Sequence, residues 1–218
     1  MIFSVFDKLL DRGYECCMEI SSEINNKITR ALRQSAYGIV PGFLDPAMVT
    51  DLSRDIDTLE KEQMFKGAAV GRGQEKQEAD LIRRDRTCWL DSVATTPLRQ
   101  SLLEKLESLR LILNQDLHLG LFQLDTLYSI YEKGDFYRRH NDVFRNDNSR
   151  VLSSVLYLNE NWRPSDGGEL ILYPEGEPVT VNPQGGTLVC FLSSTEHEVK
   201  ETFARRKSCA SWFSRRRA

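Results

Sequence analysis

The chain has 218 residues, of which 40% are hydrophobic and 28% are charged, so it can bury one sizeable core, and we expect a single domain over residues 1–218. Its net charge of −3 argues against a dedicated nucleic-acid-binding protein, and the basic run 215–217 is typical of a solvated tail. The apolar run 1–6 is too short for a signal peptide or a membrane span, so neither secretion nor a membrane partner is expected.

The N-terminal region predicts helices followed by a strand. Residues 4–34 carry apolar side chains at helical spacing, with an interruption near Gly13, which favours one or two packing helices. Residues 38–40 then predict a short strand that ends at a Pro-Gly turn.

Two longer helices are predicted next. Asp45 and Pro46 provide an N-cap and a proline at the first helical position, so we expect a helix that runs to about Met64. Another helix is expected over about 97–114. Between these helices the glycine-rich and charged segment 66–80 predicts a mobile surface finger, and it lacks the Lys-Ser/Thr that would make it a phosphate-binding P-loop.

From Phe122 onward the sequence changes to short β-type segments separated by turns rich in glycine, proline and aspartate, at 166–168 (Asp-Gly-Gly), 174–176 and 183–186. Eight such segments predict a mainly β fold, a jelly roll (double-stranded β-helix) supported by the preceding helices. The predicted strands are 122–131, 136–143, 151–158, 168–173, 178–182, 186–192, 197–203 and 206–214.

The five cysteines form no Cys-x-x-Cys pair, and Cys190 and Cys209 lie in apolar strand-like runs where a reduced thiol packs. Reduced cysteines are typical of the cytosol, so we expect a cytoplasmic protein. The third histidine, His118, follows the second long helix and is expected to be a structural or surface residue.

Two of the three histidines and one carboxylate form a candidate metal-binding site: His140, Asp142 and His197. Residues i and i+2 of a strand point to the same side, so one short strand can present His140 and Asp142 together. Two imidazoles and one carboxylate, with the opposite positions open, are the ligand set of non-haem Fe(II) oxygenases. A His-x-Asp triplet alone is weak evidence, so the rest of the chain must decide.

A buried arginine is the second candidate feature. In an extended strand, Arg206 shares a face with Trp212, whereas Arg205 points to the other face. A buried guanidinium needs an anionic partner, and a ligand carboxylate suits its planar fork. A surface cluster of basic residues remains the alternative interpretation.

Taken together, these residues resemble the 2-oxoglutarate- and Fe(II)-dependent oxygenases, and more narrowly the prolyl 4-hydroxylases related to the hypoxia-inducible-factor hydroxylases and their bacterial relatives. The resemblance extends over about residues 37–214. It rests on an ordered series of segments: 131–142, 155–162, 167–170, 197–199 and 206–213.

The resemblance implies roles for individual residues. His140, Asp142 and His197 would bind the catalytic iron. Arg206, nine residues after His197, would bind the far carboxylate of 2-oxoglutarate, with Arg205 as its rival. Two tyrosines would complete this site: Tyr157 would hydrogen-bond the same carboxylate, and Tyr131 would line the pocket.

The segment 82–89 resembles the part of the family that follows a finger closing over a peptide substrate. The substrate-side candidates matched by motif position are Asp85, Trp89, Tyr137, Arg150 and Trp212. The chain departs from the family at Arg84, where relatives commonly carry glycine, and at Ala210, where animal relatives have a hydroxyl residue. These departures bear on the finger's conformation and on the shape of the co-substrate pocket.

The resemblance also implies the chemistry. Fe(II), 2-oxoglutarate and O2 would be used, with ascorbate as an accessory reductant, to hydroxylate a prolyl residue of a protein substrate with formation of succinate and CO2. Because some bacterial relatives act on a translation elongation factor, such a factor is a first candidate. Halogenating relatives lack the carboxylate that Asp142 provides. The implied organisation is an N-terminal helical extension (1–36), supporting helices with the finger (37–121) and the jelly-roll core (122–214).

The sequence also bears on three other functions. A nucleic-acid demethylase of the same superfamily usually carries a second arginine six residues after the first, where this chain has Trp212. A hydroxylase of a free amino acid or another small molecule stays open, as does a non-catalytic jelly-roll binding module, although the intact triad argues against the latter. An unpaired edge of the roll could join a second copy, but nothing in the sequence requires it.

Overall fold

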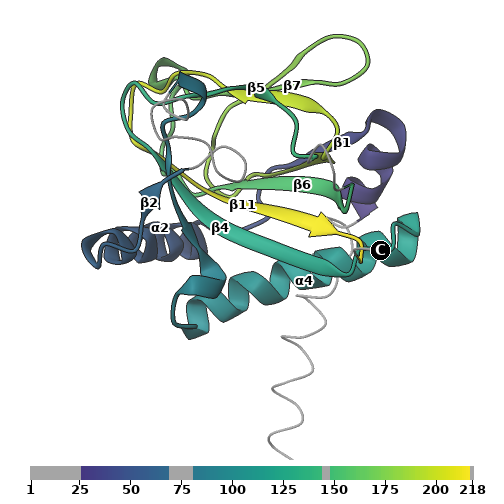
Figure 1. Ribbon diagram of the computed structural model, residues 1–218, viewed down its shortest axis with the longest axis horizontal. Helices are drawn as coiled ribbons and strands as arrows, with labels where there is room; N and C mark the ends of the chain where they lie inside the picture. Colours follow the sequence, from purple (N-terminus) through teal and green to yellow (C-terminus); the bar gives the residue numbers. More distant parts are fainter. Residues whose placement is uncertain (1–25, 69–80, 144–147, 217–218) are drawn as a thin grey trace, which may run out of the picture.

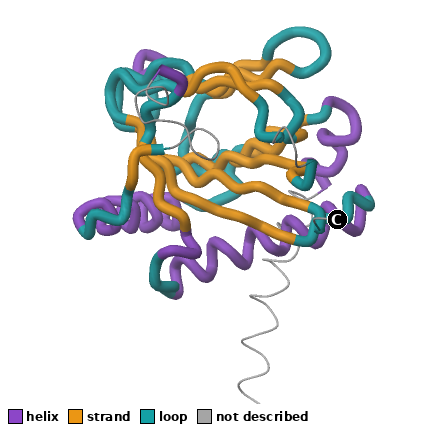
Figure 2. Tube along the Cα trace, viewed as in Figure 1, coloured by secondary structure: helices purple, strands orange, loops and turns teal. Residues whose placement is uncertain are grey.

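The computed structural model describes residues 26–68, 81–143 and 148–216, which form two facing antiparallel sheets with helices against the outer side of the larger sheet (Figures 1 and 2). Residues 26–35 are helical, as predicted, whereas the predicted helical residues 4–25 and the finger residues 69–80 lie outside the described residues.

The larger sheet has the strand order β1-β9-β6-β11-β4-β3-β2, and the smaller has the order β5-β10-β7-β8. The strands are β1 (Tyr37–Val40), β2 (Lys66–Gly67), β3 (Arg86–Trp89), β4 (Gln123–Tyr131), β5 (Tyr137–His140), β6 (Arg150–Tyr157), β7 (Leu170–Tyr173), β8 (Val179–Val181), β9 (Leu188–Leu192), β10 (Glu196–Val199) and β11 (Arg206–Ser214). The helices with complete bounds are α2 (Pro46–Lys61) and α4 (Pro97–Leu117), and short 3-10 turns are η1 (Leu90–Ser92) and η2 (Pro164–Asp166).

The mainly β jelly-roll architecture expected from the sequence is confirmed, and each of the eight strands predicted between 122 and 214 is present. Strand β3 was not predicted. It is a four-residue strand with one fully buried side chain, and its extended shape depends on pairing with β4, far away in the sequence. Tertiary pairing therefore decides its structure.

Helix α2 begins as predicted, because the Asp45 side chain accepts a hydrogen bond from the Met48 N–H and proline occupies the first turn. The helix ends at Lys61, earlier than the expected Met64, and Gln63 has a positive φ of 60° that no helix accommodates. Helix α4 continues past the expected residue 114 and ends where His118 adopts the left-handed conformation. His118 thus caps a helix, as its expected structural role implies.

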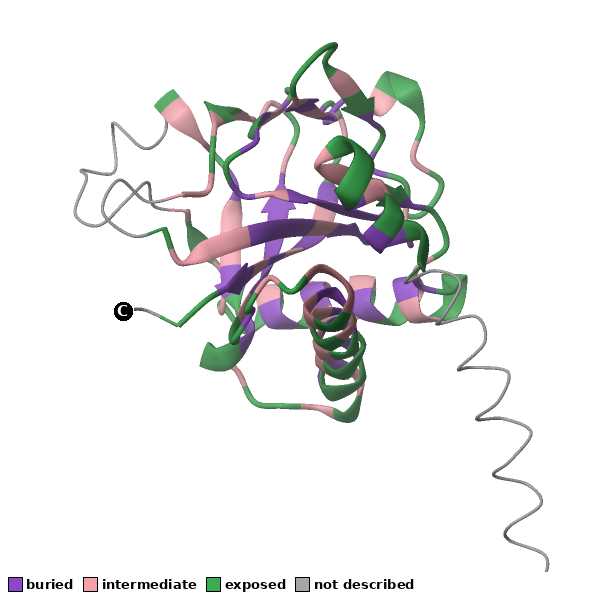
Figure 3. Ribbon diagram, turned by 90° about the vertical axis from the view of Figure 1, so that its right-hand side faces the viewer, coloured by how far each residue is buried: buried purple, intermediate pink, exposed green. Residues whose placement is uncertain are grey.

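One hydrophobic core lies between the helices and the larger sheet (Figure 3). Leu52 and Ile56 of α2 and Leu106 of α4 are fully buried against strand residues of β4, β6 and β11. At the edge of this layer, Arg99 of α4 and Asp55 of α2 form a bidentate ion pair that joins the two helices. The helices therefore support the outer face of the larger sheet and leave its inner face to the smaller sheet.

A second core lies between the two sheets. Its buried members come from both: Tyr131, Tyr157, Val189 and Phe191 from the larger sheet, and Leu170, Leu172, Val181 and Val199 from the smaller. The candidate metal ligands and Arg206 belong to this inner space or to its rim.

Within the described ranges no helix is long and apolar enough to cross a membrane. The described cysteines, Cys88, Cys190 and Cys209, are reduced and buried. Burial raises the pKa of the Cys190 and Cys209 thiols to about 12, so these side chains stay protonated and pack as small apolar groups, as expected.

Candidate functional site

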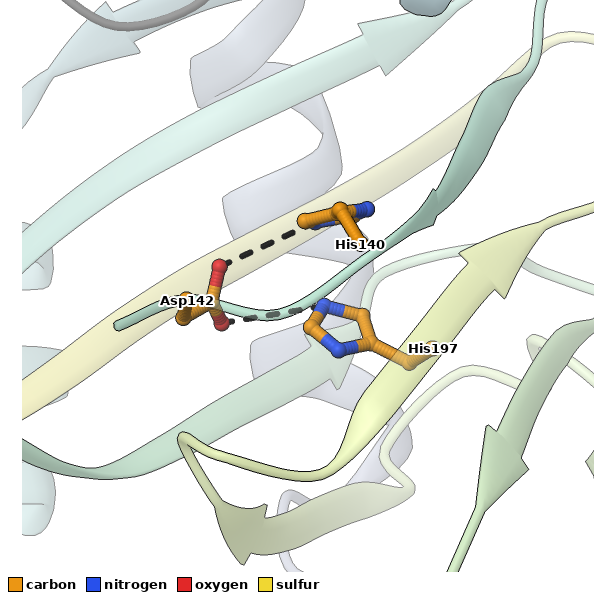
Figure 4. Close-up of side chains that lie close together, drawn as sticks. All are labelled: His140, Asp142 and His197. Atoms are coloured by element: carbon orange, nitrogen blue, oxygen red, sulfur yellow. Dashed lines mark ion pairs between the residues drawn. The ribbon is translucent and has the colours of Figure 1, made fainter. Parts of the chain in front are cut away.

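His140, Asp142 and His197 meet between the two sheets (Figure 4). The pairing of β5 with β10 sets His140 directly opposite His197. The carboxylate of Asp142 faces both rings from one side, with Oδ1 3.7 Å from His140 Nε2 and Oδ2 3.6 Å from His197 Nε2. The ligand atoms of all three residues lie within 4.8 Å of one another, so they can hold one metal ion.

The way β5 presents these residues differs from the regular strand that we expected. The strand ends at His140, and Asp142 lies on a bend beyond it. Within β5 the pairing with β10 shifts, because His140 and Tyr137 face His197 and Val199, which are one residue closer together. The extra residue in β5 creates a β-bulge. Because of this bulge, the side chains of Tyr137 and His140 both point toward the interior.

Hydrogen bonds to the backbone orient both imidazoles. Nδ1 of His140 lies 2.7 Å from the Arg138 carbonyl oxygen, and Nδ1 of His197 lies 3.0 Å from that of Thr195. A carbonyl oxygen only accepts, so each Nδ1 carries the hydrogen and each Nε2 keeps its lone pair for a metal.

The Asp142 carboxylate is fixed by the larger sheet. The Ser153 hydroxyl of β6 donates to Oδ2 over 2.6 Å and also contacts the Ser193 hydroxyl at 3.0 Å. The backbone N–H of Asp142 donates to the Ser193 carbonyl oxygen. The sequence did not suggest either serine, since only the pairing of β6 with β9 brings them to Asp142.

The electrostatics suit a metal site. Burial alone would raise the pKa of Asp142, but His197, the Ser153 hydroxyl and His140 outweigh burial and lower this pKa. The indole N–H of Trp212, which has no hydrogen-bond partner among the described residues, also faces the carboxylate and adds to the lowering. Burial, helped by His197, lowers the pKa of His140 to about 4. The carboxylate is thus charged and the His140 imidazole neutral near pH 7, as metal ligands must be.

The inner face of the larger sheet carries the second group of polar residues. Arg206, on β11, is only 1% exposed, yet it makes no ion pair with any described residue. Its Nη1 contacts the Ser208 hydroxyl at 3.2 Å, and its guanidinium lies 4.8 Å from the ring centroid of Tyr131 and 5.2 Å from that of Tyr157. The burial expected for Arg206 is confirmed.

Two buried polar atoms here lack partners among the described residues: Nε of Arg206 and the hydroxyl of Tyr157. Burial raises the pKa of Tyr157 to about 12, with Arg206 opposing the rise, so the hydroxyl keeps its proton and can donate. A buried cation and a buried hydroxyl without partners are costly, and a bound carboxylate would satisfy both. The residues present therefore fit the far carboxylate of 2-oxoglutarate.

The remaining space around Arg206 is kept open by a glycine. Gly168 has a φ of +66°, and a Cβ at this position would lie 3.1 Å from Cδ of Arg206 and 3.1 Å from Cβ of Thr202. The Asp-Gly-Gly turn before β7 was predicted only as a turn, but its second glycine also lets the arginine side chain pass.

Three of the expected substrate-side residues lie together on the rim. The rings of Trp89 and Trp212 are 5.7 Å apart, and the guanidinium of Arg150 lies 4.3 Å from the centroid of Trp212. Trp89 is 39% exposed, so this aromatic pair is partly open to solvent. Because Trp212 pairs with Ser153 in the sheet, this aromatic group adjoins the Asp142 carboxylate.

Asp85 does not lie with these three residues on the rim but is enclosed in the protein interior. Its side chain is fully buried, and its carboxylate already accepts two hydrogen bonds from Arg83 and one from Ser129. This burial speaks against direct contact with substrate. Contact of Asp85 with substrate stays a prediction from motif position; the partners of its carboxylate in this structure are Arg83 and Ser129, and the sequence could not show that Ser129 of β4 lies beside it.

Tyr137, the last substrate-side candidate, stacks on His140 with ring centroids 3.6 Å apart. Arg83, which the sequence did not single out, covers the other face of the Tyr137 ring at 4.2 Å. The sequence signal was an arginine close to Asp85. It could not single out Arg83, because Arg84 and Arg86 are also close to Asp85.

Comparison with known proteins agrees with this geometry. Residues 126–214 match the family model described as the 2OG-Fe(II) oxygenase superfamily. A prolyl-4-hydroxylase from Pseudomonas putida is 34% identical to this chain, with a TM-score of 0.78, and the similarity covers 87% of this chain and 98% of that one. A prolyl hydroxylase from Trichoplax adhaerens, in complex with a peptide fragment of the hypoxia inducible factor oxygen degradation domain, is 25% identical with a TM-score of 0.81, over 90% and 91% of the two chains.

The fold is also shared with an α-ketoglutarate-dependent epimerase of nogalamycin biosynthesis, which is 15% identical with a TM-score of 0.67 over 88% of this chain and 80% of that one. At that identity the likeness concerns the fold alone. The Pseudomonas similarity extends over nearly the whole of both chains, and the three ligand residues meet where one ion can be held. This chain therefore belongs to the 2OG-Fe(II) oxygenase superfamily, as a 2-oxoglutarate-dependent dioxygenase of the kind that uses iron and O2.

Proposed function

We propose that this enzyme hydroxylates a prolyl residue in a protein substrate and converts 2-oxoglutarate and O2 to succinate and CO2 as it does so. The observation that carries the proposal is the 34% identity to a prolyl-4-hydroxylase that extends over 98% of that chain. The Trichoplax enzyme, which was solved with a bound peptide, supports a peptide or protein rather than a free amino acid as substrate.

In this proposal His140, Asp142 and His197 hold Fe(II). Bound iron and 2-oxoglutarate together supply the activation of O2 that hydroxylates an unactivated C–H bond. The protein's contribution is geometric and electrostatic. The Arg138 and Thr195 carbonyls direct the imidazole lone pairs, and the Ser153 hydroxyl keeps the carboxylate ionised and oriented.

The co-substrate is assigned to Arg206, Tyr157 and Tyr131. The guanidinium would neutralise the far carboxylate of 2-oxoglutarate, and the Tyr157 hydroxyl would donate to the same group. Tyr131 lies opposite Arg206 across β4 and β11, and its ring holds one side of the guanidinium. Both cofactor sites lie on inner faces of the roll, where water has little access.

The substrate would approach over Trp89, Trp212 and Arg150, with Tyr137 deeper in the site. Flat aromatic faces pack well against a pyrrolidine ring, and an arginine on the rim can bond a peptide carbonyl. A translation elongation factor is the first candidate protein to test, on the basis of the resemblance to bacterial prolyl hydroxylases.

A hydroxylase of a free amino acid or of another small molecule is the second candidate. The nogalamycin epimerase, with the same fold, is what favours keeping it. The exposed face of Trp89, outside the iron-proximal residues, favours the longer substrate, since a small molecule would have no use for it. The idea of a non-catalytic binding module receives no support, because the ligand set is complete.

The test measures conversion of 2-oxoglutarate to succinate by the purified, Fe(II)-loaded enzyme. Proline-containing peptides from candidate proteins, including an elongation factor, are compared with free proline, and products are examined by mass spectrometry for one added oxygen atom on proline. Asp142→Ala is the matched control. Stimulation by free proline alone would favour the small-molecule function, and equal turnover in Asp142→Ala would sink the iron assignment.

A further inference from the structure

Three side chains form a stack that ends on a metal-ligand candidate. The Arg83 guanidinium lies 4.2 Å over the ring of Tyr137, and the other face of that ring packs on the His140 imidazole at 3.6 Å with an interplanar angle of 16°. A cation over an aromatic face is attracted to it, and more strongly when both are shielded from water. The side chain of Arg83 is only 15% exposed.

Arg83 is itself held in place. Its Nε and Nη2 donate to the two oxygens of Asp85 over 2.7 and 2.6 Å, and the carboxylate also accepts from the Ser129 hydroxyl of β4. The backbones of Arg83 and Tyr137 form a β-bridge, and the N–H of Arg84 donates to the Phe136 carbonyl oxygen. Both the side chain and the main chain of this segment are therefore fixed against the start of β5.

The bulge in β5 bears on how His140 is supported. It turns Tyr137 and His140 to the same side of the strand, and the neighbouring pairs with Val199 and His197 no longer keep a regular spacing. A ligand at a bulge has less support from the sheet than one in a regular ladder. The stack offers such support from the side, since the Tyr137 ring lies between the guanidinium and the imidazole.

We propose that Arg83, fixed by Asp85 and Ser129, is a positioning residue of the metal site that acts through the Tyr137 ring to hold the imidazole of His140 in its metal-binding orientation. The inference rests on the proposed function, because it takes His140 as a metal ligand. It gives Asp85 a role that its burial permits: the carboxylate orients Arg83 rather than touching substrate.

The test uses Co(II) binding to the metal-free, full-length protein, followed by the visible absorption of the bound ion, so turnover is not required. Arg83→Met alone would leave a buried carboxylate without its cation, and the main variant is therefore the double substitution Arg83→Met with Asp85→Asn. Arg83→Lys keeps the charge but cannot lie flat on the ring or bond both oxygens. Arg84→Met is the matched control, since the Arg84 guanidinium lies over Phe136 instead.

The double substitution should weaken Co(II) binding about tenfold and change the visible spectrum, as loss of an outer partner of a metal ligand does. Arg83→Lys should recover only part of the affinity, and Arg84→Met should match the unmodified protein in affinity and spectrum. Circular dichroism shows whether each variant is folded. If the double variant does not fold, Arg83→Lys becomes the variant that decides the test. Wild-type affinity and spectrum in Arg83→Lys and in the double substitution would overturn the inference.

A double-mutant cycle shows whether Arg83 acts through Tyr137. Tyr137→Leu removes the ring, and in that background the Arg83/Asp85 substitutions should cost less than about twofold more in affinity. Fully additive losses would contradict action through the ring. Asp142→Ala separates the two proposals. If it abolishes Co(II) binding while the Arg83 variants bind normally, only the inference falls; if it binds Co(II) unchanged, the iron assignment itself is wrong and the inference falls with it.

Discussion

Arg205 and Arg206 are neighbours in the chain, but their guanidinium groups lie on opposite sides of the larger sheet. Arg205 faces the helix layer and pairs with Glu60 of α2, while Arg206 is buried between the sheets against Tyr131 and Tyr157. Arg205 directly precedes β11, and the alternation of successive side chains in an extended chain explains why it faces the opposite side from Arg206. Of the two arginines, therefore, Arg206 is the one whose position suits the co-substrate carboxylate in the proposed function.

Replacing the two arginines should separate these roles. Arg206→Ala removes a charge-assisted contact worth about 3 kcal/mol, which corresponds to roughly a hundredfold weaker binding of 2-oxoglutarate. Arg205→Ala loses only partly exposed ion pairs, so it should change this affinity by less than about twofold and lower stability by at most about 1 kcal/mol. Calorimetric titration of the Mn(II)-loaded proteins with 2-oxoglutarate measures the affinity of each variant, and urea unfolding measures its stability. A larger loss in Arg205→Ala would show that the wrong arginine was chosen.

The Ser153 hydroxyl should matter to metal affinity although it touches no metal. It donates to Oδ2 of Asp142, so Ser153→Ala leaves the carboxylate with one donor fewer, and we expect Mn(II) affinity to fall about tenfold. Ser154→Ala is the matched control, because the Ser154 hydroxyl is buried without a partner among the described residues. Removing it should leave Mn(II) affinity unchanged and should not lower thermal stability. Equal metal affinities in the two variants would contradict the role given to Ser153.

The sequence predicted the parts of this site that depend on local pattern. Alternation along 205–212 separated Arg206 from Arg205, and the Asp45-Pro46 signal placed the start of α2. Alternation failed at β5, where a regular strand would turn Tyr137 away from His140. The bulge there is set by pairing with β10, so it depends on residues that are distant in the sequence.

The outer partners of the site could not be predicted for the same reason. Ser153 of β6 meets Asp142 on the bend that follows β5, and Ser129 of β4 meets the buried Asp85, each through a contact between distant parts of the chain. Serines in strands carry no signal of the side chains that they will meet. Motif position suggested that Asp85 contacts substrate. Only the tertiary structure shows that its carboxylate forms an ion pair with Arg83.

The Tyr157 hydroxyl should affect co-substrate binding more than folding. It is fully buried and has no hydrogen-bond partner among the described residues, so Tyr157→Phe should leave the free protein as stable or up to about 1 kcal/mol more stable. The variant should bind 2-oxoglutarate about tenfold or more weakly, because one hydrogen bond to a charged group is lost.

Thermal unfolding of the Mn(II)-loaded protein with and without 2-oxoglutarate checks this prediction, since weaker binding gives a smaller rise in Tm. Tyr128→Phe provides the control, because Tyr128 is a buried tyrosine on the helix side of β4. Its ligand-induced rise in Tm should equal that of the unmodified enzyme. The same rise in Tyr157→Phe would argue that this hydroxyl does not touch the co-substrate.

Gly168 should prove necessary for the co-substrate site as well as for its turn. Gly168→Ala places a methyl group 3.1 Å from Cδ of Arg206 and in a backbone conformation with φ of +66°, so Arg206 must move. Gly120→Ala meets the same backbone penalty at φ of +68° but nothing within 4 Å. Each substitution should therefore cost about 1 to 2 kcal/mol of folding free energy from backbone strain, with a further cost at Gly168.

The two glycine variants should differ most in the KM for 2-oxoglutarate. Displacement of the guanidinium predicts a rise of about tenfold in Gly168→Ala, whereas Gly120→Ala should keep the unmodified KM, because Gly120 lies in the loop after α4. Steady-state kinetics with varied 2-oxoglutarate, together with urea unfolding of both proteins, separates the backbone penalty from the displacement of Arg206. Equal stability losses with an unchanged KM in both variants would mean that Gly168 serves the turn alone.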